Sequence, residues 1–370
     1  MRVALDATPL LGTPTGVGRY VAGLVDALTR QPDRPDLTLA AFTWRGAKDV
    51  PAPPGVRVAG RRAPARLLQQ LWSRVDLPPV EWLTGRADVV HGTNFVLPPR
   101  RRAAGVVTVH DLAYLHDVET VTPQTLRYQQ LVPRALRRGA VAVTPSQATK
   151  DDLVATYGTD PARIHVTPLG IDPDWFATVP PSASWLADVG LPERYVLAVG
   201  NLEPRKNLPD LVEAHRRLVA AEPGTPPLVL VGPPGWGEPL QAGPDVVFAG
   251  YQRGETLRRL VAGAAVLAFP SRREGFGLPP LEALACGVPV VASDLAVTRE
   301  VLGDAATFTP VGDVDALAHA LHEALAAGTG AGTTASAARR DRARSFTWDR
   351  CARATLVAYA EALEVSSGGR

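Results

Sequence analysis

Two glutamates, eight positions apart, enclose the glycine-rich segment EGFGLPPLE, which runs from Glu274 to Glu282. The segment follows an apolar run, residues 266–269, of the length expected for a buried parallel strand. Pro279 and Pro280 suit the first turn of a helix, where a missing N–H group costs no hydrogen bond. The N–H groups of such a strand–loop–helix segment favour an anion, and carboxylates accept hydrogen bonds from hydroxyls. We therefore expect a ligand with both phosphate and hydroxyl groups, such as a nucleotide sugar.

Glu282 also has a simpler explanation. We expect it in the first turn of the helix, where a negative charge offsets the helix dipole whatever the protein binds. Glu274 has less of a structural explanation, because it stands at a strand end, where open α/β sheets bind their ligands.

Arg205 and Lys206 form a second candidate site for contacts with phosphate. They lie in the segment GNLEPRKN, residues 200–207, between an apolar run at 195–199 and a helical apolar pattern that starts at Leu208. Two adjacent cations in this position can neutralise a diphosphate, the arginine through its fork of N–H groups and the lysine as a point charge. The alternative is a solvated turn.

The first half of the chain offers weaker candidates. His110 follows the apolar run 106–109, and a histidine in such a place is more often structural than catalytic. Gly16 and Gly18 form a turn at the start of a helix, which can hold a phosphate. A dinucleotide fingerprint fits poorly, because these glycines come about ten residues after the first strand and Val21 fills the third glycine position.

The stretch EGFGLPPLEALACGVPVVAS, residues 274–293, resembles the E-x7-E signature of the retaining GT-B glycosyltransferases of family 4. The resemblance extends over nearly the whole chain and is stronger in the second half. It implies that Glu282 holds the ribose of a nucleotide, that Glu274 lies near the donor sugar and that His110 approaches that sugar. Family members often carry an arginine directly after the glycine, where this chain has Asn201, and Arg205 is the candidate to replace it.

Two sets of site residues follow from position and resemblance together. The catalytic candidates are His110, Arg205, Lys206 and Glu274. The donor-binding candidates are Gly16, Gly18, Gly200, Asn201, Tyr251, Ser271, Gly275, Phe276, Gly277, Leu278 and Glu282.

The resemblance implies transfer of a hexose from a nucleotide-diphospho-sugar, with retention of configuration, to a saccharide, lipid-linked or small-molecule acceptor. The segments TGVGRY and GNLEPRKN are most similar to bacterial members that use GDP-mannose, which favours mannose. No metal or other cofactor is expected, although Asp172 and Asp174 form a D-x-D pattern that binds metal in another glycosyltransferase fold. The alternatives are a non-catalytic sugar-nucleotide-binding protein, an NAD-dependent oxidoreductase and a sugar phosphorylase with pyridoxal phosphate.

Short apolar runs alternate with helical patterns along the chain, which is typical of βαβ units and parallel sheets. With 370 residues, two domains are the default. We predict an α/β protein of the GT-B type, with two Rossmann-like domains facing each other across a cleft. Residues 1–176 form the acceptor-binding domain and 177–347 the nucleotide-sugar-binding domain, with a linker near 177–192. Residues 348–370 form a helix that returns to the first domain. The predicted strands cover residues 2–6, 37–43, 89–91, 106–109, 141–144, 164–166, 195–200, 228–231, 246–248, 266–269 and 288–291.

Composition excludes some classes of protein. The net charge of +2 argues against nucleic-acid binding, and no stretch reaches the ~18–20 apolar residues of a membrane span. The two cysteines lack the spacing of a metal site, and with no signal-peptide pattern at the start this predicts a cytoplasmic protein.

The first half of the chain is basic: residues 1–180 hold 21 Lys+Arg against 16 Asp+Glu. This excess is either a solvated basic face or a peripheral contact with the inner membrane surface or a phosphorylated acceptor. It is concentrated in Arg61, Arg62, Arg66, Arg100, Arg101, Arg102, Arg134, Arg137 and Arg138.

Overall fold

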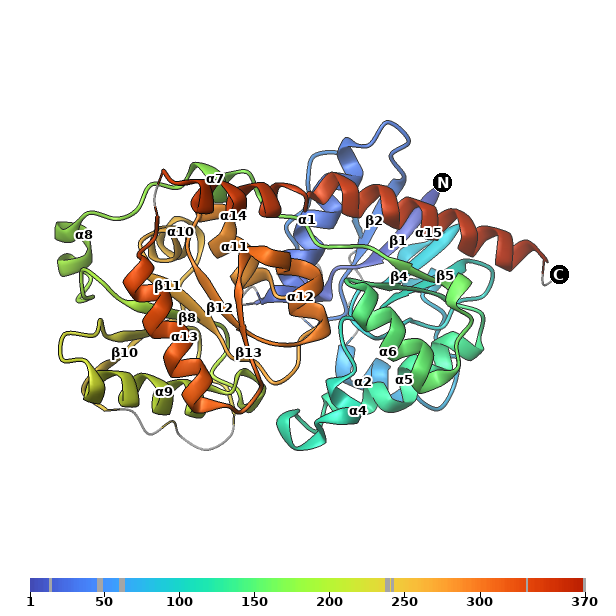
Figure 1. Cartoon of the computed structure of the whole chain (residues 1–370). Coiled ribbons are helices and arrows are strands. Elements are labelled where there is room, and N and C mark those ends of the chain that lie inside the picture. The colour runs from blue at the N-terminus through green and yellow to red at the C-terminus, as the bar shows by residue number, and fades with distance from the viewer. Residues whose placement is uncertain are drawn as a thin grey trace. The chain divides into compact units, whose positions relative to one another are not determined.

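The computed structural model describes residues 1–12, 15–44, 49–59, 64–236, 240, 243–330 and 332–368. The chain divides into two compact units, residues 1–170 with 347–370 (unit 1) and residues 171–346 (unit 2). Each unit contains one parallel sheet covered by helices, which confirms the prediction of two Rossmann-like domains (Figure 1). The division after Gly170 comes before the predicted one after residue 176. The reason is that Trp175 is buried in unit 2, where its carbonyl lies 3.4 Å from the sulfur of Cys286.

Unit 1 has a seven-stranded sheet with the order β3-β2-β1-β4-β5-β6-β7. The chain moves outward from β1 to β3, then crosses back to place β4 on the other side of β1. This reversal makes β1 and β4 the topological switch point, outside whose carboxyl ends ligands bind in open sheets. The strands are β1 (Arg2–Asp6), β2 (Asp36–Ala40), β3 (Arg57–Ala59), β4 (Val89–Gly92), β5 (Ala104–Thr108), β6 (Val141–Thr144) and β7 (Ile164–Val166).

The helices of unit 1 cover both faces of this sheet. The α-helices are α1 (Gly16–Arg30), α2 (Ala65–Trp72), α3 (Glu81–Thr84), α4 (Ala113–His116), α5 (Tyr128–Arg137), α6 (Gln147–Tyr157) and α15 (Trp348–Gly368). The last helix packs on α1, β5 and β6 (Figure 1). The buried His91 connects it to the sheet, because its ring nitrogens lie 2.8 Å from the hydroxyls of Tyr359 and Thr108.

Unit 2 has a six-stranded parallel sheet with the order β10-β9-β8-β11-β12-β13. Here the reversal falls between β8 and β11. The strands are β8 (Val196–Val199), β9 (Leu228–Val231), β10 (Val246–Gly250), β11 (Val266–Phe269), β12 (Val290–Ser293) and β13 (Thr307–Thr309). The α-helices are α7 (Asp174–Ala177), α8 (Ala183–Asp188), α9 (Leu208–Ala221), α10 (Gly254–Ala262), α11 (Leu278–Cys286), α12 (Ala296–Leu302), α13 (Val314–Ala327) and α14 (Thr334–Arg344).

The central strands β8, β9 and β11 of unit 2 are apolar along their whole length because helices cover both faces of the sheet. In unit 2, Val196, Val266 and Val291 of three neighbouring strands pack with leucines of α9 and α13 in one buried cluster. Shorter elements were harder to predict. β3 and β13 were not among the predicted strands, and β3 lies in a stretch rich in proline and arginine. Arg61 and Arg62 lie outside the described residues.

Candidate donor site

The strongest candidates for the site come from the loops that follow β8 and β11. These two strands are paired neighbours at the switch point of unit 2, so their carboxyl ends open at the same place on the sheet edge. The backbone joins the two loops, because the N–H of Arg272 donates to the carbonyl of Arg205 at 2.9 Å. Segments 67 residues apart in the sequence are thereby held side by side.

Glu274 is the centre of a compact charged group. Its Oε1 lies 2.6 Å from Lys206 Nζ, and its Oε2 lies 3.2 Å from Arg205 Nη1. Burial raises the pKa of this carboxyl, but Lys206 and Arg205 outweigh that effect and lower the pKa to about 2. The side chain is therefore an anion at neutral pH even though it is 8% exposed.

Arg205 and Lys206 differ in how far the protein already uses their N–H groups. Arg205 donates from Nε and Nη2 to Glu203 Oε1, at 3.2 and 2.8 Å, and from Nη1 to Glu274 and to the carbonyl of Arg273. All three nitrogens of the guanidinium are thus engaged. Lys206 donates to one carboxylate and lies 5.0 Å from the centre of the Phe269 ring.

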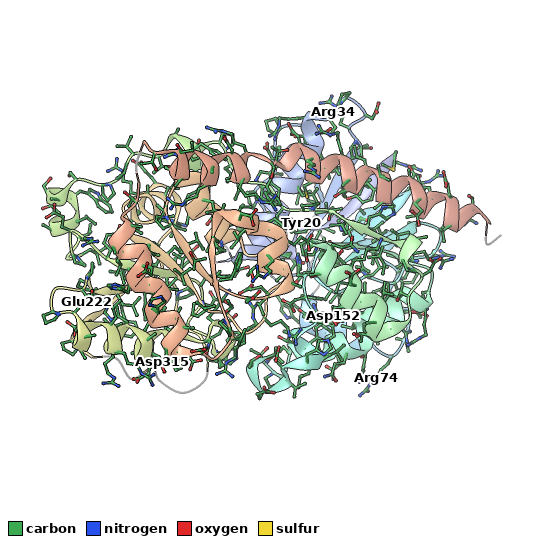
Figure 2. All side chains as sticks on the ribbon, in the orientation of Figure 1. Tyr20, Arg34, Arg74, Asp152, Glu222 and Asp315 are labelled. Atoms are coloured by element: carbon green, nitrogen blue, oxygen red, sulfur yellow. The ribbon has the colours of Figure 1, made fainter. Side chains whose placement is uncertain are left out.

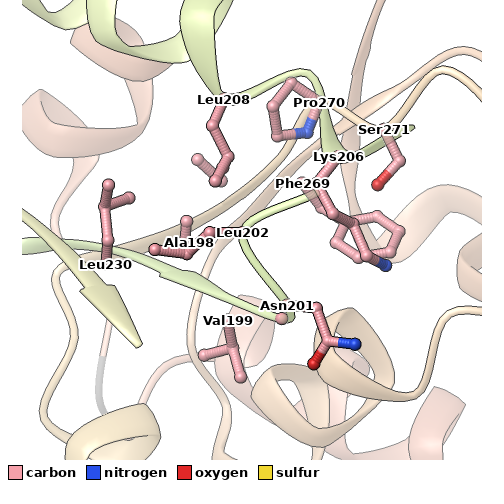
Figure 3. Close-up of a pocket in the computed structure, with 12 residues that line it drawn as sticks. Ala198, Val199, Asn201, Leu202, Lys206, Leu208, Leu230, Phe269, Pro270 and Ser271 are labelled. Atoms are coloured by element: carbon pink, nitrogen blue, oxygen red, sulfur yellow. The ribbon is translucent and has the colours of Figure 1, made fainter. Parts of the chain in front are cut away.

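Lys206 also faces a small pocket at the ends of the two strands (Figure 3). The close-up shows its side chain extending over the Phe269 ring, with Asn201 and Ser271 in the pocket wall. The pocket therefore gathers four predicted site residues, Gly200, Asn201, Lys206 and Ser271. Its full lining is Ala198, Val199, Gly200, Asn201, Leu202, Lys206, Leu208, Leu230, Ala268, Phe269, Pro270 and Ser271.

The start of α11 has the predicted glycine turn, but Glu282 lies one turn later in the helix than expected. Gly277 precedes the helix with φ of 95°, a left-handed conformation that favours glycine. Pro279 and Pro280 occupy the first turn and carry no N–H, so loop amides must supply most donors for an anion. Glu282 was expected in the first turn but lies in the second, because the helix begins at Leu278, and it is fully buried.

Other predicted donor residues contribute less through their side chains. Phe276 is buried and its ring meets that of Phe346 at 5.6 Å, and Leu278 is buried as well, so their backbone is the part available to a ligand. Tyr251 follows β10, which β9 separates from β8, so it belongs to the same sheet edge but not to the pocket. The loop after β9 is packed tightly against that after β8, since a Cβ on Gly232 would lie 1.8 Å from the Gly200 carbonyl oxygen.

Two residues at this site, Glu203 and Asn207, were not selected as candidates in the sequence analysis. Glu203 holds the guanidinium of Arg205, and it stands in the GNLEPRKN segment whose cations alone were considered. Asn207 has a positive φ of 54° and precedes α9. Its amide donates to Asp210 at 2.7 Å and accepts from Arg272 at 3.1 Å. An asparagine directly before a Leu-Pro helix start is a signal that could have identified this turn.

The remaining candidates, Gly16, Gly18 and His110, belong to unit 1. Gly18 is close to the chain before the helix, because a Cβ there would lie 2.7 Å from the Pro9 carbonyl oxygen, and its N–H donates to the hydroxyl of Thr15 at 3.5 Å. His110 Nε2 lies 2.9 Å from the carbonyl oxygen of Thr93. Burial lowers the pKa of His110, partly offset by that hydrogen bond, so the neutral ring is favoured.

Asp6 ends β1 at the switch point of unit 1, and it was not among the candidates selected from the sequence. Its carboxylate accepts hydrogen bonds from the N–H and hydroxyl of Thr8, at 2.9 and 2.6 Å. Burial nevertheless raises the pKa of Asp6 to about 6. Thr93, from the loop after β4, donates to the Asp6 carbonyl at 2.6 Å, so the loops after the two switch-point strands are joined here.

The described part of the chain contains neither a cluster of metal ligands nor a helix suited to cross a membrane. No three His, Cys, Asp or Glu side chains of those residues come together as metal ligands would. None of the helices described is both long enough and apolar enough to cross a bilayer.

Residues 14–175 match the model of Glycosyltransferase Family 4, and residues 193–327 match that of Glycosyl transferases group 1. The D-inositol 3-phosphate glycosyltransferase of Mycobacterium avium is 32% identical over 298 residues, covering 76% of this chain and 68% of the relative. The chain belongs to the family 4 glycosyltransferases. Membership of a glycosyltransferase family excludes the oxidoreductase alternative. The two parallel-sheet units are the two Rossmann-like domains of the GT-B fold.

Further similar proteins match nearly the whole length of the chain. The O-antigen chain mannosyltransferase B of Escherichia coli is 28% identical over 399 residues, covering 97% of this chain and 99% of the relative. Among solved structures, that of Anabaena HepE in complex with UDP superposes with a TM-score of 0.66 and 20% identity, over 98% of this chain and 100% of that one. At that identity the structural match shows the fold alone.

Proposed function

We propose that this glycosyltransferase transfers a hexose from a nucleotide-diphospho-sugar with retention of configuration, and that unit 2 binds the donor at the ends of β8 and β11. The observation that carries the proposal is the contact of Lys206 with Glu274 at the switch point, 2.6 Å between Nζ and Oε1. This contact supports the proposal because a cation suited to phosphate and an acceptor suited to sugar hydroxyls stand on neighbouring loops.

Within this site we assign Lys206 to the diphosphate. Its ammonium has three N–H donors, bonds one carboxylate among the described residues and faces the pocket. Arg205 is instead a positioning residue, because Glu203, Glu274 and the Arg273 carbonyl occupy its guanidinium. Glu282 takes the ribose, as the resemblance to the family signature implies, because its buried carboxylate can accept hydrogen bonds from ribose hydroxyls.

The reaction needs no protein nucleophile. The bond between the anomeric carbon and the phosphate oxygen breaks, and its electron pair leaves with the nucleoside diphosphate. The acceptor oxygen forms its bond to the anomeric carbon on the same face, and its proton passes to an oxygen of the departing phosphate. Lys206 and the amides of residues 275–278 stabilise the negative charge that develops on the leaving group. No metal ion or other cofactor is part of this scheme.

Mannose, carried by GDP, is the donor sugar that we favour. The support is the segments TGVGRY and GNLEPRKN together with the full-length similarity to a mannosyltransferase of O-antigen chains. For the acceptor, that relative favours a saccharide or lipid-linked saccharide of polysaccharide biosynthesis. The mycobacterial relatives, which are inositol 3-phosphate glycosyltransferases, favour a small molecule.

A thermal-shift screen with GDP-, UDP-, ADP- and dTDP-sugars tests the donor site. A donor present at about 100 times its dissociation constant adds ~2.7 kcal/mol to the free energy of unfolding. We expect one nucleotide to raise Tm clearly and the shift to be lost in Glu282→Ala. NMR of the product should then show the same anomeric configuration at the transferred sugar as in the donor. The proposal fails if no nucleotide sugar shifts Tm, or if the product has the opposite configuration.

A further inference from the structure

An arginine-lined pocket lies in unit 1 at the edge of the sheet opposite to the switch point. Three consecutive arginines, Arg100 to Arg102, come directly before β5 and therefore stand at the amino-terminal edge of the sheet. Arg138, just past the end of α5, and Ser366, near the end of α15, complete the lining with Ala103. Neither the family assignment nor the proposed reaction gives this pocket a role.

The pocket carries more positive than negative charge. Arg100 donates from Nη2 to the carbonyl of Arg138 at 3.0 Å, and its guanidinium packs against Gly105. Burial, together with Arg138, lowers the pKa of Arg100 to about 10, as expected for a cation among cations. Two carboxylates reach the group. Glu81 accepts from the backbone N–H groups of Arg101 and Arg102, and Asp76 pairs with Arg134 and Arg138.

A run of exposed apolar side chains adjoins this pocket. Leu68 and Trp72 of α2 are buried in the core, whereas Leu67 and Leu71 on another side of the same helix are exposed. The run continues past the helix. Its members are between 42% and 56% exposed, and they are Leu67, Leu71, Val75, Leu77 and Trp82. We call these five residues the apolar ridge.

Hydrogen bonds hold the apolar ridge beside the arginines. Asp76, between Val75 and Leu77 in the sequence, is the residue that pairs with Arg134 and Arg138. Glu81, directly before Trp82, accepts from the backbone of two pocket arginines, and the N–H of Val80 donates to the Pro99 carbonyl at 2.8 Å. The acids of the segment thus face the arginines.

We propose that the apolar ridge and the arginine pocket form a docking surface for an anionic phospholipid bilayer, with a lipid phosphate held in the pocket. Protein surfaces that bind at the boundary between lipid headgroups and acyl chains typically combine leucine and tryptophan with neighbouring arginines. Arginine forks match phosphate oxygens, and each basic residue near an anionic leaflet adds to the attraction. The inference does not depend on the donor site.

Vesicle flotation tests this surface. The wild-type protein should float with phosphatidylcholine vesicles that contain phosphatidylglycerol, and much less with phosphatidylcholine alone or at 0.5 M NaCl. Arg101→Glu with Arg102→Glu should weaken binding about tenfold or more, given the worth of each basic residue. Leu71→Ser with Trp82→Ser should weaken it through the apolar contact, without loss of Tm because both side chains are exposed.

Matched controls separate this surface from general charge and hydrophobicity. Arg34→Glu changes an exposed arginine of unit 1 that Figure 2 shows far from Arg74, which directly precedes Val75 of the apolar ridge. Val179→Ser removes a side chain that is 75% exposed in unit 2. Both should float like the wild type. Equal loss in Arg34→Glu, equal flotation with neutral vesicles, or unchanged flotation of both double variants would overturn the proposal. Binding of inorganic phosphate without any flotation would overturn it too, and would identify a soluble ligand instead.

Discussion

Lys206 Nζ lies 2.6 Å from Glu274 Oε1, and this contact joins the loops that follow two neighbouring strands of unit 2. With Arg205 and Glu203 the group holds two cations and two carboxylates, and none of the four side chains is more than 20% exposed. The formal charge of this group is zero. In the proposed donor complex, the diphosphate therefore shares Lys206 with Glu274, and the sugar lies next to the carboxylate.

Lys206→Ala should lower kcat more than it raises KM, because the ammonium acts mainly on charge that develops as the diphosphate leaves. Loss of one such donor typically costs about 10²–10³ in kcat. Arg205→Ala should reduce turnover less, since its guanidinium is bonded within the protein. Steady-state kinetics of both variants, with exposed Arg216→Ala as a control, makes the comparison. A larger loss of kcat in Arg205→Ala would reverse the two roles.

Glu274 should make the protein lose stability in acid. Its pKa is lowered to about 2 in the fold, against the ordinary value of 4.5 in the unfolded chain. A lowered pKa stabilises the fold above pH 4.5, and this contribution disappears as the pH falls toward 2. The difference amounts to on the order of 3 kcal/mol. Urea unfolding between pH 2 and 7 should show wild type and Glu274→Gln converging at the acid end. Parallel curves would contradict the ionised assignment.

Asp6 should have the opposite effect to Glu274 and make the protein lose stability as the pH rises. Its pKa of about 6 lies above the ordinary value of 3.8, so the fold favours the protonated form. That stabilisation is complete below pH 3.8 and is lost as the pH rises through 6. Asp6→Asn, whose amide oxygen can still accept from Thr8, should remove this slope and be more stable at pH 7 by on the order of 2–3 kcal/mol. A wild type more stable than Asp6→Asn at pH 7 would show that the carboxylate is needed there.

The sequence was informative where one local pattern determined the structure. Long apolar runs such as 266–269 predicted their strands because a strand covered on both faces has no polar position. The Glu274 loop was found because glycines, prolines and carboxylates lie within nine residues. β3 and β13 have three residues each and only one large apolar side chain apiece, Val58 and Phe308, so no strand pattern stands out. The equally short β7 was predicted because Ile164 and Val166 are both large and apolar. The pairing of Arg205 with Glu203 and Glu274 could not be predicted either, since it depends on the order of strands in the sheet.

Gly16 and Gly18 look alike in the sequence, yet the structure gives them different requirements. A Cβ on Gly18 would lie 2.7 Å from the backbone oxygen of Pro9, whereas one on Gly16 would have no neighbour within 4 Å. Gly18→Ala must therefore shift either α1 or the turn before it, at a cost of about 1–3 kcal/mol. Gly16→Ala should be neutral or stabilise by up to ~1 kcal/mol, because alanine loses less backbone entropy in a helix.

The two alanine variants differ by the position of one methyl group, so each serves as the control for the other. Urea unfolding at pH 7 measures both free energies, and a shared m-value shows that the unfolded states are alike. We expect Gly18→Ala to unfold at a lower urea concentration than the wild type and Gly16→Ala at an equal or higher one. Equal losses in both would mean that the turn needs glycine for its backbone conformation, and the close approach of Pro9 to Gly18 would then not be the reason for the glycine.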